Sequence, residues 1–193
     1  MDPACPTDGI GEEALLHQAL AGCEASFAEL YRRRQGAIYR FAFHMCGDTQ
    51  AAEDVTQAVF IVLLEQGRRF DATRGALISF LFGIARNLVL QRFRKQEVAL
   101  PEHHMWPSGE DIGQDLERRE MIEHVRAAVL SLPVRYRAAV VLCDLEGVSY
   151  EDAARILECP LGTVRSRLKR ARGLLAQKLT AHAKWSGVVR SNK

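Results

Sequence analysis

The residues best suited to chemistry lie near the C-terminal end, where basic side chains recur along a predicted helix that begins at about residue 161. At about 3.6 residues per turn, the side that must pack inward carries Leu161, Val164, Leu168, Ala171 and Leu175. The opposite side and its flanks carry Gly162, Thr163, Arg165, Ser166, Arg167, Lys169, Arg170, Arg172 and Gly173. No carboxylate occurs from 159 to 193. Such a face suits DNA, because arginine and lysine bind both phosphates and base edges.

The residues before this helix predict a shorter helix and a tight turn. Ser149 and Asp152 have the spacing of a capping box, and apolar residues follow at 153, 154, 156 and 157. Pro160 then ends the pattern, because it lacks an amide proton and restricts the residue before it. The stretch 149–175 is therefore typical of a helix-turn-helix whose second helix enters the major groove. The alternative is a solvated basic helix, but turn, packing face and charge together favour DNA binding.

The distribution of charge also indicates an anionic partner at the C-terminal end. The chain of 193 residues has a net charge of +2 and is long enough for one or two small domains. Residues 1–31 contain six acids and no lysine or arginine, whereas residues 159–193 contain nine bases and no acid. The positive end is the one that carries the predicted helix-turn-helix.

Other classes of site are disfavoured. There is no apolar run of about 18 residues and no signal-peptide pattern at the acidic N-terminus, so we expect a cytoplasmic protein without membrane insertion. The five cysteines are scattered and form no C-x-x-C, which predicts neither a disulfide framework nor a metal site. His103 and His104 beside Glu102 could bind a metal, but a solvated loop is favoured because zinc needs further ligands. We expect no cofactor.

Helical periodicity runs through most of the chain and predicts an all-α protein of two small domains. Helices are expected at about 11–20, 24–46, 50–66, 76–96, 115–130 and 133–145, before the helix-turn-helix. Residues 97–120 carry seven acids and two bases, with prolines and glycines, and predict a flexible acidic linker. Residues 185–193 are expected to form a loose tail.

The helix expected at 50–66, capped by Asp48 or Thr49, is apolar on most sides. Its inward stripe is predicted to contain Val55, Val59 and Val62. Further apolar residues, Phe60, Ile61 and Leu64, extend round towards Asp54 and Gln57. Such a helix is either buried or covered by a partner. The pattern by itself favours burial.

The helix expected at 76–96 follows a loop that contains Arg68, Arg69 and Arg74. Its inward side is predicted to carry Leu77, Leu81, Ile84, Ala85 and Leu88. Its outward side is predicted to carry Phe82, Arg86, Val89, Leu90 and Phe93, with Asn87 and Arg94 beside them. Aromatic rings and arginines on one face suit unstacked bases of a single strand. The alternative is a second packed face, and the pattern does not decide between the two.

Three motifs in this order resemble the extracytoplasmic-function sigma factors, the small two-domain promoter-recognition subunits of bacterial RNA polymerase. Residues 52–60 are similar to the helix that binds the polymerase clamp. The run Ile84, Ala85, Arg86 and Asn87 is similar to the helix after the promoter-melting loop. Residues from 132 to 171, with Gly162, Thr163 and Val164 inside them, resemble the family's second domain throughout. The resemblance covers about 25–179.

The resemblance implies a leader at 1–20, a region 2 domain at 21–97, a linker at 98–118, a region 4 domain at 119–180 and a tail at 181–193. Region 4 is expected to bind the minus-35 duplex through Thr163, Arg165, Ser166, Arg167, Lys169, Arg170 and Arg172. Region 2 is expected to bind the melted minus-10 element through Arg74, Phe82, Arg86, Asn87 and Phe93. The clamp of the polymerase β′ subunit is expected to contact Asp54, Gln57, Phe60, Ile61 and Leu64. An anti-sigma factor is a further implied partner.

Two other classes of function are open at this point. A helix-turn-helix regulator that does not associate with core polymerase would also explain 149–175, but residues 11–96 contain no evident sensor site. An all-helical enzyme is disfavoured, because the sequence contains no nucleophile elbow, P-loop or H-E-x-x-H. Co-purification with core polymerase separates the sigma factor from the regulator.

Overall fold

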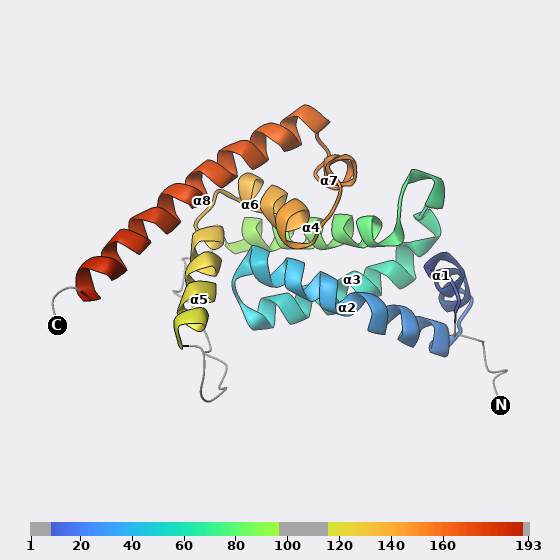
Figure 1. Cartoon of the computed structure of the whole chain (residues 1–193). Helices are drawn as coiled ribbons and strands as arrows, with labels where there is room; N and C mark the ends of the chain where they lie inside the picture. The colour runs from blue at the N-terminus through green and yellow to red at the C-terminus, as the bar shows by residue number, and fades with distance from the viewer. Residues whose placement is uncertain (1–8, 97–115, 191–193) are drawn as a thin grey trace. The chain divides into compact units, whose positions relative to one another are not determined.

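The computed structural model describes residues 9–96 and 116–190, with side chains over 9–95 and 121–180. Every regular element in those residues is helical, which confirms the all-α prediction. The chain forms two units, Met1–Pro101 and Glu102–Lys193, whose helices are labelled in Figure 1. Most of the expected linker, including His103 and His104, lies outside the described residues, as do 1–8 and 191–193.

Unit 1 is organised around its second helix. It contains α1 (Glu12–Leu20), α2 (Glu24–Cys46), α3 (Thr49–Gln66) and α4 (Leu77–Gln96), with the short 3₁₀ turns η1 (Gly67–Arg69) and η2 (Ala72–Arg74) before α4. α2 is central because it packs against α1, α3 and α4. Its buried side chains follow helical spacing and include Leu30, Ile38, Phe41, Ala42 and Met45.

The corner between α2 and α3 is set by two adjacent residues. Gly47 ends α2 with φ of 76°, in the left-handed region that favours glycine. Asp48 then caps α3, because its Oδ1 accepts a hydrogen bond from the amide of Ala51 at 2.6 Å. This confirms the predicted helix boundary.

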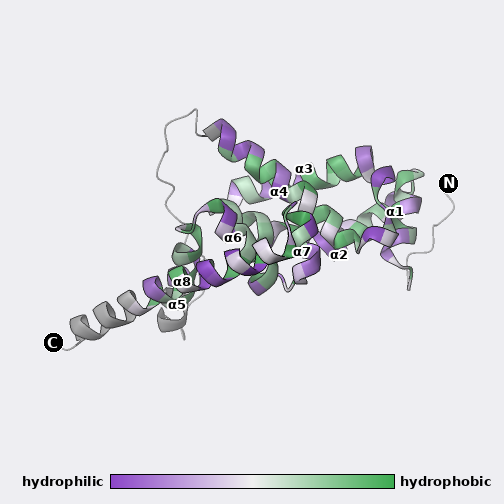
Figure 2. Cartoon of the chain, turned by 90° about the horizontal axis from the view of Figure 1, so that it is seen from above, coloured by the Kyte–Doolittle hydropathy of each residue, from purple (hydrophilic) through white to green (hydrophobic). Residues whose placement is uncertain are grey.

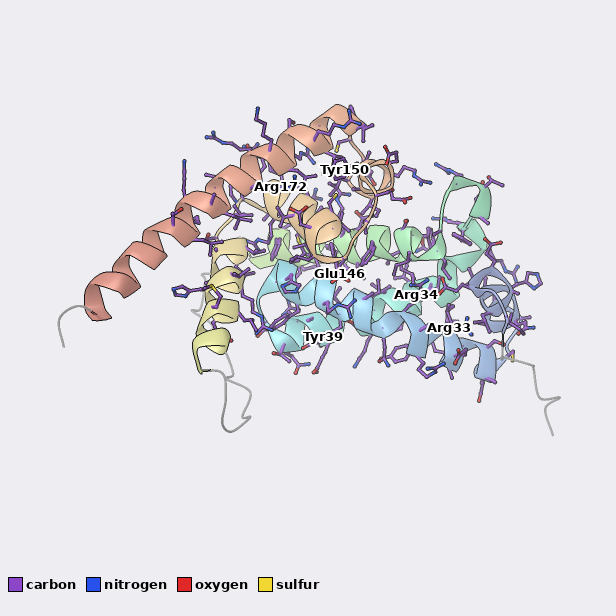
Figure 3. The ribbon with its side chains drawn as sticks, viewed as in Figure 1. Arg33, Arg34, Tyr39, Glu146, Tyr150 and Arg172 are labelled. Atoms are coloured by element: carbon purple, nitrogen blue, oxygen red, sulfur yellow. The ribbon has the colours of Figure 1, made fainter. Side chains whose placement is uncertain are left out.

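α1 is attached to α2 by packing and by two arginines. The Nε of Arg34 lies 2.5 Å from Oε1 of Glu12, and Arg33 donates to the carbonyl of Ile10 at 2.9 Å. Figure 3 labels both arginines on α2. The buried side chains of α1 are Leu15, Leu16 and Ala19. The helix expected at 11–20 is therefore packed onto the helices that follow it.

α4 buries a face that is turned from the predicted one, since Ile84 and Leu88, expected to point inward, are only half-buried. The side chains of Phe82 and Val89, expected to point outward, are only 2% and 0% exposed, so that prediction is wrong. The reason is that α4 packs against both α2 and α3 and needs an apolar stripe for each. The ring of Phe82 lies 5.4 Å from that of Phe41, between centroids. The face is completed by Leu77, Leu81 and Ala85.

Unit 2 contains the predicted helix-turn-helix. Its elements are α5 (Leu116–Leu130), α6 (Val134–Val140), the π-helical segment η3 (Val141–Leu145), α7 (Tyr150–Ile156) and α8 (Leu161–Arg190). α8 packs against α5, α6 and α7. The best-buried side chains include Leu132, Val140, Leu142, Val164 and Leu168.

α8 continues to Arg190, so the prediction of a loose tail is wrong for 185–190. Residues 161–190 contain no proline, and 181, 183 and 184 are alanine or lysine. These are good helix formers, and nothing in the sequence ends the helix before the described residues end.

The cap at the start of α7 and the turn between α7 and α8 both lie where the sequence predicts them. The Oγ of Ser149 accepts from the amide of Asp152 at 3.0 Å and starts α7. Glu158 then adopts φ of 52°, an unusual value for a residue with a side chain. The carbonyl of Pro160 accepts from the amide of Thr163 at 2.8 Å and starts α8. The chain thus reverses over a few residues.

Among the described residues, no disulfide joins any two of the cysteines Cys23, Cys46, Cys143 and Cys159. Burial, with a smaller contribution from Asp144, raises the pKa of Cys143 to about 11. In the part of the chain that the structure describes, no group of three or more His, Cys, Asp or Glu side chains could hold a metal ion. None of the described helices combines the length and apolar character needed to cross a membrane.

Candidate nucleic-acid interface

α8 presents the basic face that its sequence predicts. Val164 and Ala171 are fully buried, so the opposite side of the helix is turned to solvent. The exposed residues there include Arg165, Ser166, Lys169 and Arg170. Figure 2 shows hydrophilic residues along this part of α8. Cations without a neighbouring acid on the same helix form a surface suited to a polyanion.

Two glycines leave this face open to close approach. A Cβ at Gly162 or Gly173 would meet no atom within 4 Å, so packing inside the protein does not require glycine at either position. A glycine within a helix costs about 0.5–1 kcal/mol relative to alanine. Gly173 also lines an open depression of about 390 Å³ with Ser166, Lys169, Arg170, Leu174 and Gln177. The glycines thus weaken the helix and make room on its basic side.

Thr163 and Arg167 lie on one flank of α8 and are half-buried. The carbonyl of Thr163 accepts from the hydroxyl of Ser166 at 3.0 Å. The Nη1 of Arg167 lies 3.6 Å from the sulfur of Cys159. Arg167 therefore contacts the turn before α8, and the rest of its half-buried side chain lies at the edge of the basic face.

Arg172, on the other flank, is held by groups of the protein itself. Its Nε and Nη2 donate to the two carboxylate oxygens of Asp144 at 3.0 and 2.6 Å. Its Nη2 also lies 3.3 Å from the hydroxyl of Tyr150, and Figure 3 shows Arg172 and Tyr150 beside each other. The hydrogen bonds to Asp144 and then Tyr150 raise the pKa of Arg172 above its usual value. Sequence reasoning missed this contact, because 28 positions separate Asp144 from Arg172.

The loop before α4 exposes the expected arginine. Arg74 is exposed at the end of η2, which Asp71 caps by accepting from the amide of Thr73 at 3.0 Å. Hydrogen bonds from the Thr73 side chain and then its backbone lower the pKa of Asp71. On α4, Asn87 is exposed and its Oδ1 accepts from Arg86 at 3.1 Å. Arg74 and Asn87 therefore lie on the surface of unit 1.

The aromatic part of this face differs from the prediction. Phe82 is buried and cannot stack on a base, whereas Phe93 is half-exposed. A pair that the sequence analysis missed, Phe70 and Phe80, flanks the loop with ring centroids 5.7 Å apart, and both are half-exposed. Their positions at the two ends of the Arg74 loop were the signal available in the sequence.

The exposed face of α3 is smaller than expected. Ile61 and Leu64 are 57% and 44% exposed, and Gln57 and Asp54 are exposed with them. Asp54 pairs with Arg92 at 3.5 Å. Phe60 is only 2% exposed, so its predicted outward position is wrong: the ring fills the space between α3 and α2.

Comparisons with known proteins agree with this division. The model of Sigma-70 region 2 matches residues 30–98, and that of Sigma-70 region 4 matches residues 122–175. The chain is 37% identical over 187 residues to the ECF RNA polymerase sigma factor SigE of Mycolicibacterium smegmatis, covering 91% of this chain and 67% of that protein. It is 33% identical over 186 residues to SigM of Mycobacterium tuberculosis, covering 91% of each. The chain belongs to the extracytoplasmic-function sigma factors.

One solved structure supports the same family, and a second shows the fold. The sigma factor RpoE of Bartonella quintana, solved with the anti-sigma factor NepR, has a TM-score of 0.66 and 27% identity and covers 80% of this chain and 96% of that chain. CnrH, with a TM-score of 0.68 and 24% identity over 88% of this chain and 97% of that chain, shows the fold. As a sigma factor, the protein directs transcription initiation.

Within this sigma factor, α3 and α4 fall in the region 2 match, and α6, α7 and the basic face of α8 fall in the region 4 match. α1 lies before the region 2 match, and α8 continues beyond the region 4 match. The site residues expected on each unit therefore lie in the matched regions.

Proposed function

We propose that the two units of this sigma factor divide promoter recognition between them. Unit 1 binds core RNA polymerase and the melted minus-10 element, and unit 2 binds the minus-35 duplex. The observation that carries this proposal is the exposed face of α8, where Arg165, Lys169 and Arg170 project from a helix without acids. This face lies within the region 4 match.

For polymerase, α3 offers apolar side chains that nothing in unit 1 covers. Ile61 and Leu64, 57% and 44% exposed, lie near the polar side chain of Gln57. Large apolar residues exposed together and bordered by polar ones mark an interaction surface. We assign this face to the clamp of the β′ subunit, with Asp54 at its edge. Phe60 supports the face from within the core.

For the minus-10 element, the polar groups around the α4 face suit a single strand. Arg74, Arg86 and Asn87 hold phosphates and base edges, while half-exposed rings provide stacking surfaces. These rings are Phe93 and the pair formed by Phe70 and Phe80. Phe82, which is buried on the inner side of α4, contributes only by packing in the core of unit 1.

For the minus-35 duplex, the N-terminal part of α8 enters the major groove, as recognition helices do. The candidates for base edges are Thr163, Arg165, Ser166 and Lys169. Arg170 and Arg167 are assigned to backbone phosphates. These two cationic side chains fix the register of the helix, while the candidates for base edges distinguish the sequences.

The regulation and location of this sigma factor follow from the same activity. The similar sigma factor RpoE of Bartonella quintana was solved bound to an anti-sigma factor, and we propose such a partner here. Because the protein acts on promoter DNA, we place it in the cytoplasm. It works by binding and carries no catalytic role of its own.

The test is reconstitution with purified bacterial core polymerase. The tagged full chain should retain the core enzyme and start transcripts at defined positions on a DNA library. Replacing Ile61 and Leu64 together by serine should reduce core retention at unchanged thermal stability. Met121→Ser, which removes a 63% exposed apolar side chain from unit 2, is the matched control. Binding to duplex DNA without core retention would instead favour the helix-turn-helix regulator.

A further inference from the structure

A charged contact connects the recognition helix α8 to η3 and α7, the two elements that come directly before it. Arg172 lies on α8, Asp144 lies in the π-helical segment η3, and Tyr150 is the first residue of α7. The guanidinium donates to both oxygens of Asp144 and lies within hydrogen-bond distance of the Tyr150 hydroxyl. One side chain therefore spans the helix-turn-helix.

The side of the Arg172 guanidinium that would hold a phosphate is already occupied. Arginine holds a phosphate best with two parallel N–H groups, as it holds a carboxylate. In Arg172 the Nε and Nη2 pair that would serve this purpose is already bound to Asp144 at 3.0 and 2.6 Å. A carboxylate at that position also repels a phosphate. Arg172 therefore binds a group of its own domain, although its side chain is 52% exposed and Arg165 on the same flank is exposed as well.

The segment that carries Asp144 is itself irregular. The amide of Glu146 donates to the carbonyl of Val141 at 2.9 Å, a π-helical hydrogen bond, and Val148 donates to Leu142 at 2.9 Å. Such π-bulges re-aim side chains and are frequent at functional sites. Here the bulge lies between the packed helix α6 and the helix-turn-helix, with Asp144 facing α8.

We propose that Asp144 and Tyr150 are positioning residues for promoter recognition, which act by fixing α8 through Arg172. The inference rests on the proposed binding of the minus-35 duplex by α8. Base contacts demand that a side chain be held within about 0.5 Å and roughly 10–20° of its productive geometry, whereas phosphate contacts tolerate more. Loss of the contact therefore lowers discrimination between sequences more than it lowers general DNA affinity.

The direction in which one substitution changes DNA affinity shows whether Asp144 positions α8 or has no such role. Asp144 is an acid beside a basic face, so its negative charge opposes DNA binding. If it had no positioning role, Asp144→Asn would strengthen binding to every duplex. If it positions α8, Asp144→Asn weakens binding to the preferred duplex relative to random DNA, by about three- to five-fold, as expected for a partly exposed pair.

The experiment uses holoenzyme assembled from the full chain and bacterial core polymerase. Duplexes randomised over the upstream element are selected by the wild-type holoenzyme, and the bound pool is sequenced. The most enriched duplex and a scrambled duplex of equal length then serve as probes for each variant. Asp144→Asn and Tyr150→Phe should both lower the ratio of the two affinities, and Asp144→Glu should restore part of it.

Glu151→Gln is the matched control, because it removes an exposed acid next to Tyr150 and should leave the ratio at its wild-type value. The double variant Asp144→Ala with Arg172→Ala should lose no more discrimination than either single variant, because both break one contact. Tyr150→Phe removes a single hydroxyl, so it tests the role even if changes at Asp144 lower stability.

Three results would overturn the proposal, and they differ from one another. If wild-type holoenzyme selects a sequence and Asp144→Asn and Tyr150→Phe select it equally well, the positioning role is wrong while the proposed function stands. If Arg172→Ala weakens both probes equally and makes the salt dependence shallower by about one unit, Arg172 is a phosphate clamp. If wild-type holoenzyme selects no upstream sequence, the proposed duplex recognition itself fails, and the positioning role fails with it.

Discussion

The rings of Phe60 on α3 and Tyr31 on α2 lie 4.6 Å apart between centroids, and Phe60 is 2% exposed. Its neighbour Ile61 is 57% exposed. Phe60→Ala should therefore lower the free energy of unfolding of the region 2 unit by about 3–5 kcal/mol, through lost burial and a cavity. Ile61→Ala should change it by less than about 0.5 kcal/mol. Urea denaturation of the free proteins measures both.

The same two substitutions should affect core polymerase binding in the reverse order of their effects on stability. Ile61→Ala should weaken retention of the core enzyme, while Phe60→Ala should do so only under conditions in which the unit unfolds. Equal stability of the two variants would contradict the packing described for Phe60. Unchanged core retention by Ile61→Ala would count against the α3 interface.

Arg74 and Asn87 should matter after the duplex has opened. Both are exposed, and both are assigned to the single strand. Arg74→Ala or Asn87→Ala should reduce the permanganate reactivity of thymines in the minus-10 element, while binding of the holoenzyme to closed promoter DNA stays close to wild type. Arg32→Ala, which removes a 71% exposed arginine side chain from α2, is the control. Normal thymine reactivity in both variants would remove these residues from the minus-10 site.

The turn of the helix-turn-helix contains a residue in an unfavourable backbone conformation. Glu158 has φ of 52°, which glycine adopts readily and other residues do not. Glu158→Gly and Glu158→Ala both remove the carboxylate, so their difference isolates the backbone. The glycine variant should be the more stable by about 1 kcal/mol, as measured by the urea midpoint. Equal midpoints would show that the turn relaxes around alanine.

Local signals made much of the fold predictable. Gly47, Asp48 and Ser149 act within a few residues of themselves, so their sequence context predicts the helix boundaries that the structure confirms. The buried stripe of α8, with Val164 and Leu168, is predictable for a similar reason, since a helix with one packed side has one apolar stripe.

The errors occur where distant parts of the chain decide the outcome. Phe82 and Val89 were placed on the outward side of α4, with a second packed face left open as the alternative, and the contacts of α4 with both α2 and α3 decide for burial. The sequence does not distinguish Arg172 from the other basic residues of α8, because only the fold brings Asp144 next to it. The aromatic pair of Phe70 and Phe80 likewise depends on how the loop between them folds. Periodicity gives the face of a helix, but not the number of its neighbours.

Arg165 and Arg170 should respond differently to substitution. If Arg165 binds a base edge, Arg165→Ala should relax selectivity at one base pair by about 1–3 kcal/mol. If Arg170 binds a phosphate, Arg170→Ala should weaken selected and scrambled duplexes alike and make the salt dependence shallower by about one unit. Affinities of the holoenzyme for single-base variants at several salt concentrations measure both effects. A uniform loss in Arg165→Ala would reassign that residue to the backbone.

Gly173 provides a test in which stability and function change in opposite directions. It lies within α8, and a Cβ there would meet no atom within 4 Å. Gly173→Ala should therefore stabilise the region 4 unit by about 0.5–1 kcal/mol, because alanine is the better helix former. If the basic face lies against DNA, the added methyl group meets the duplex instead, and an overpacked contact lowers affinity by roughly five-fold or more.

Gly36→Ala is the matched control for this substitution. Gly36 is also a helical glycine, on α2 of the other unit, where a Cβ would make an ordinary contact with Arg40 at 3.6 Å. The Gly36→Ala variant should gain stability without any change in duplex binding. Thermal unfolding of the free proteins and duplex affinity of the holoenzymes give the two readouts. If Gly173→Ala gains stability and binds the selected duplex as well as wild type, the outer face of α8 does not approach DNA closely. The basic side chains along it, from Arg165 to Arg170, would then act at longer range through their charge. Selectivity would have to come from another surface of the domain.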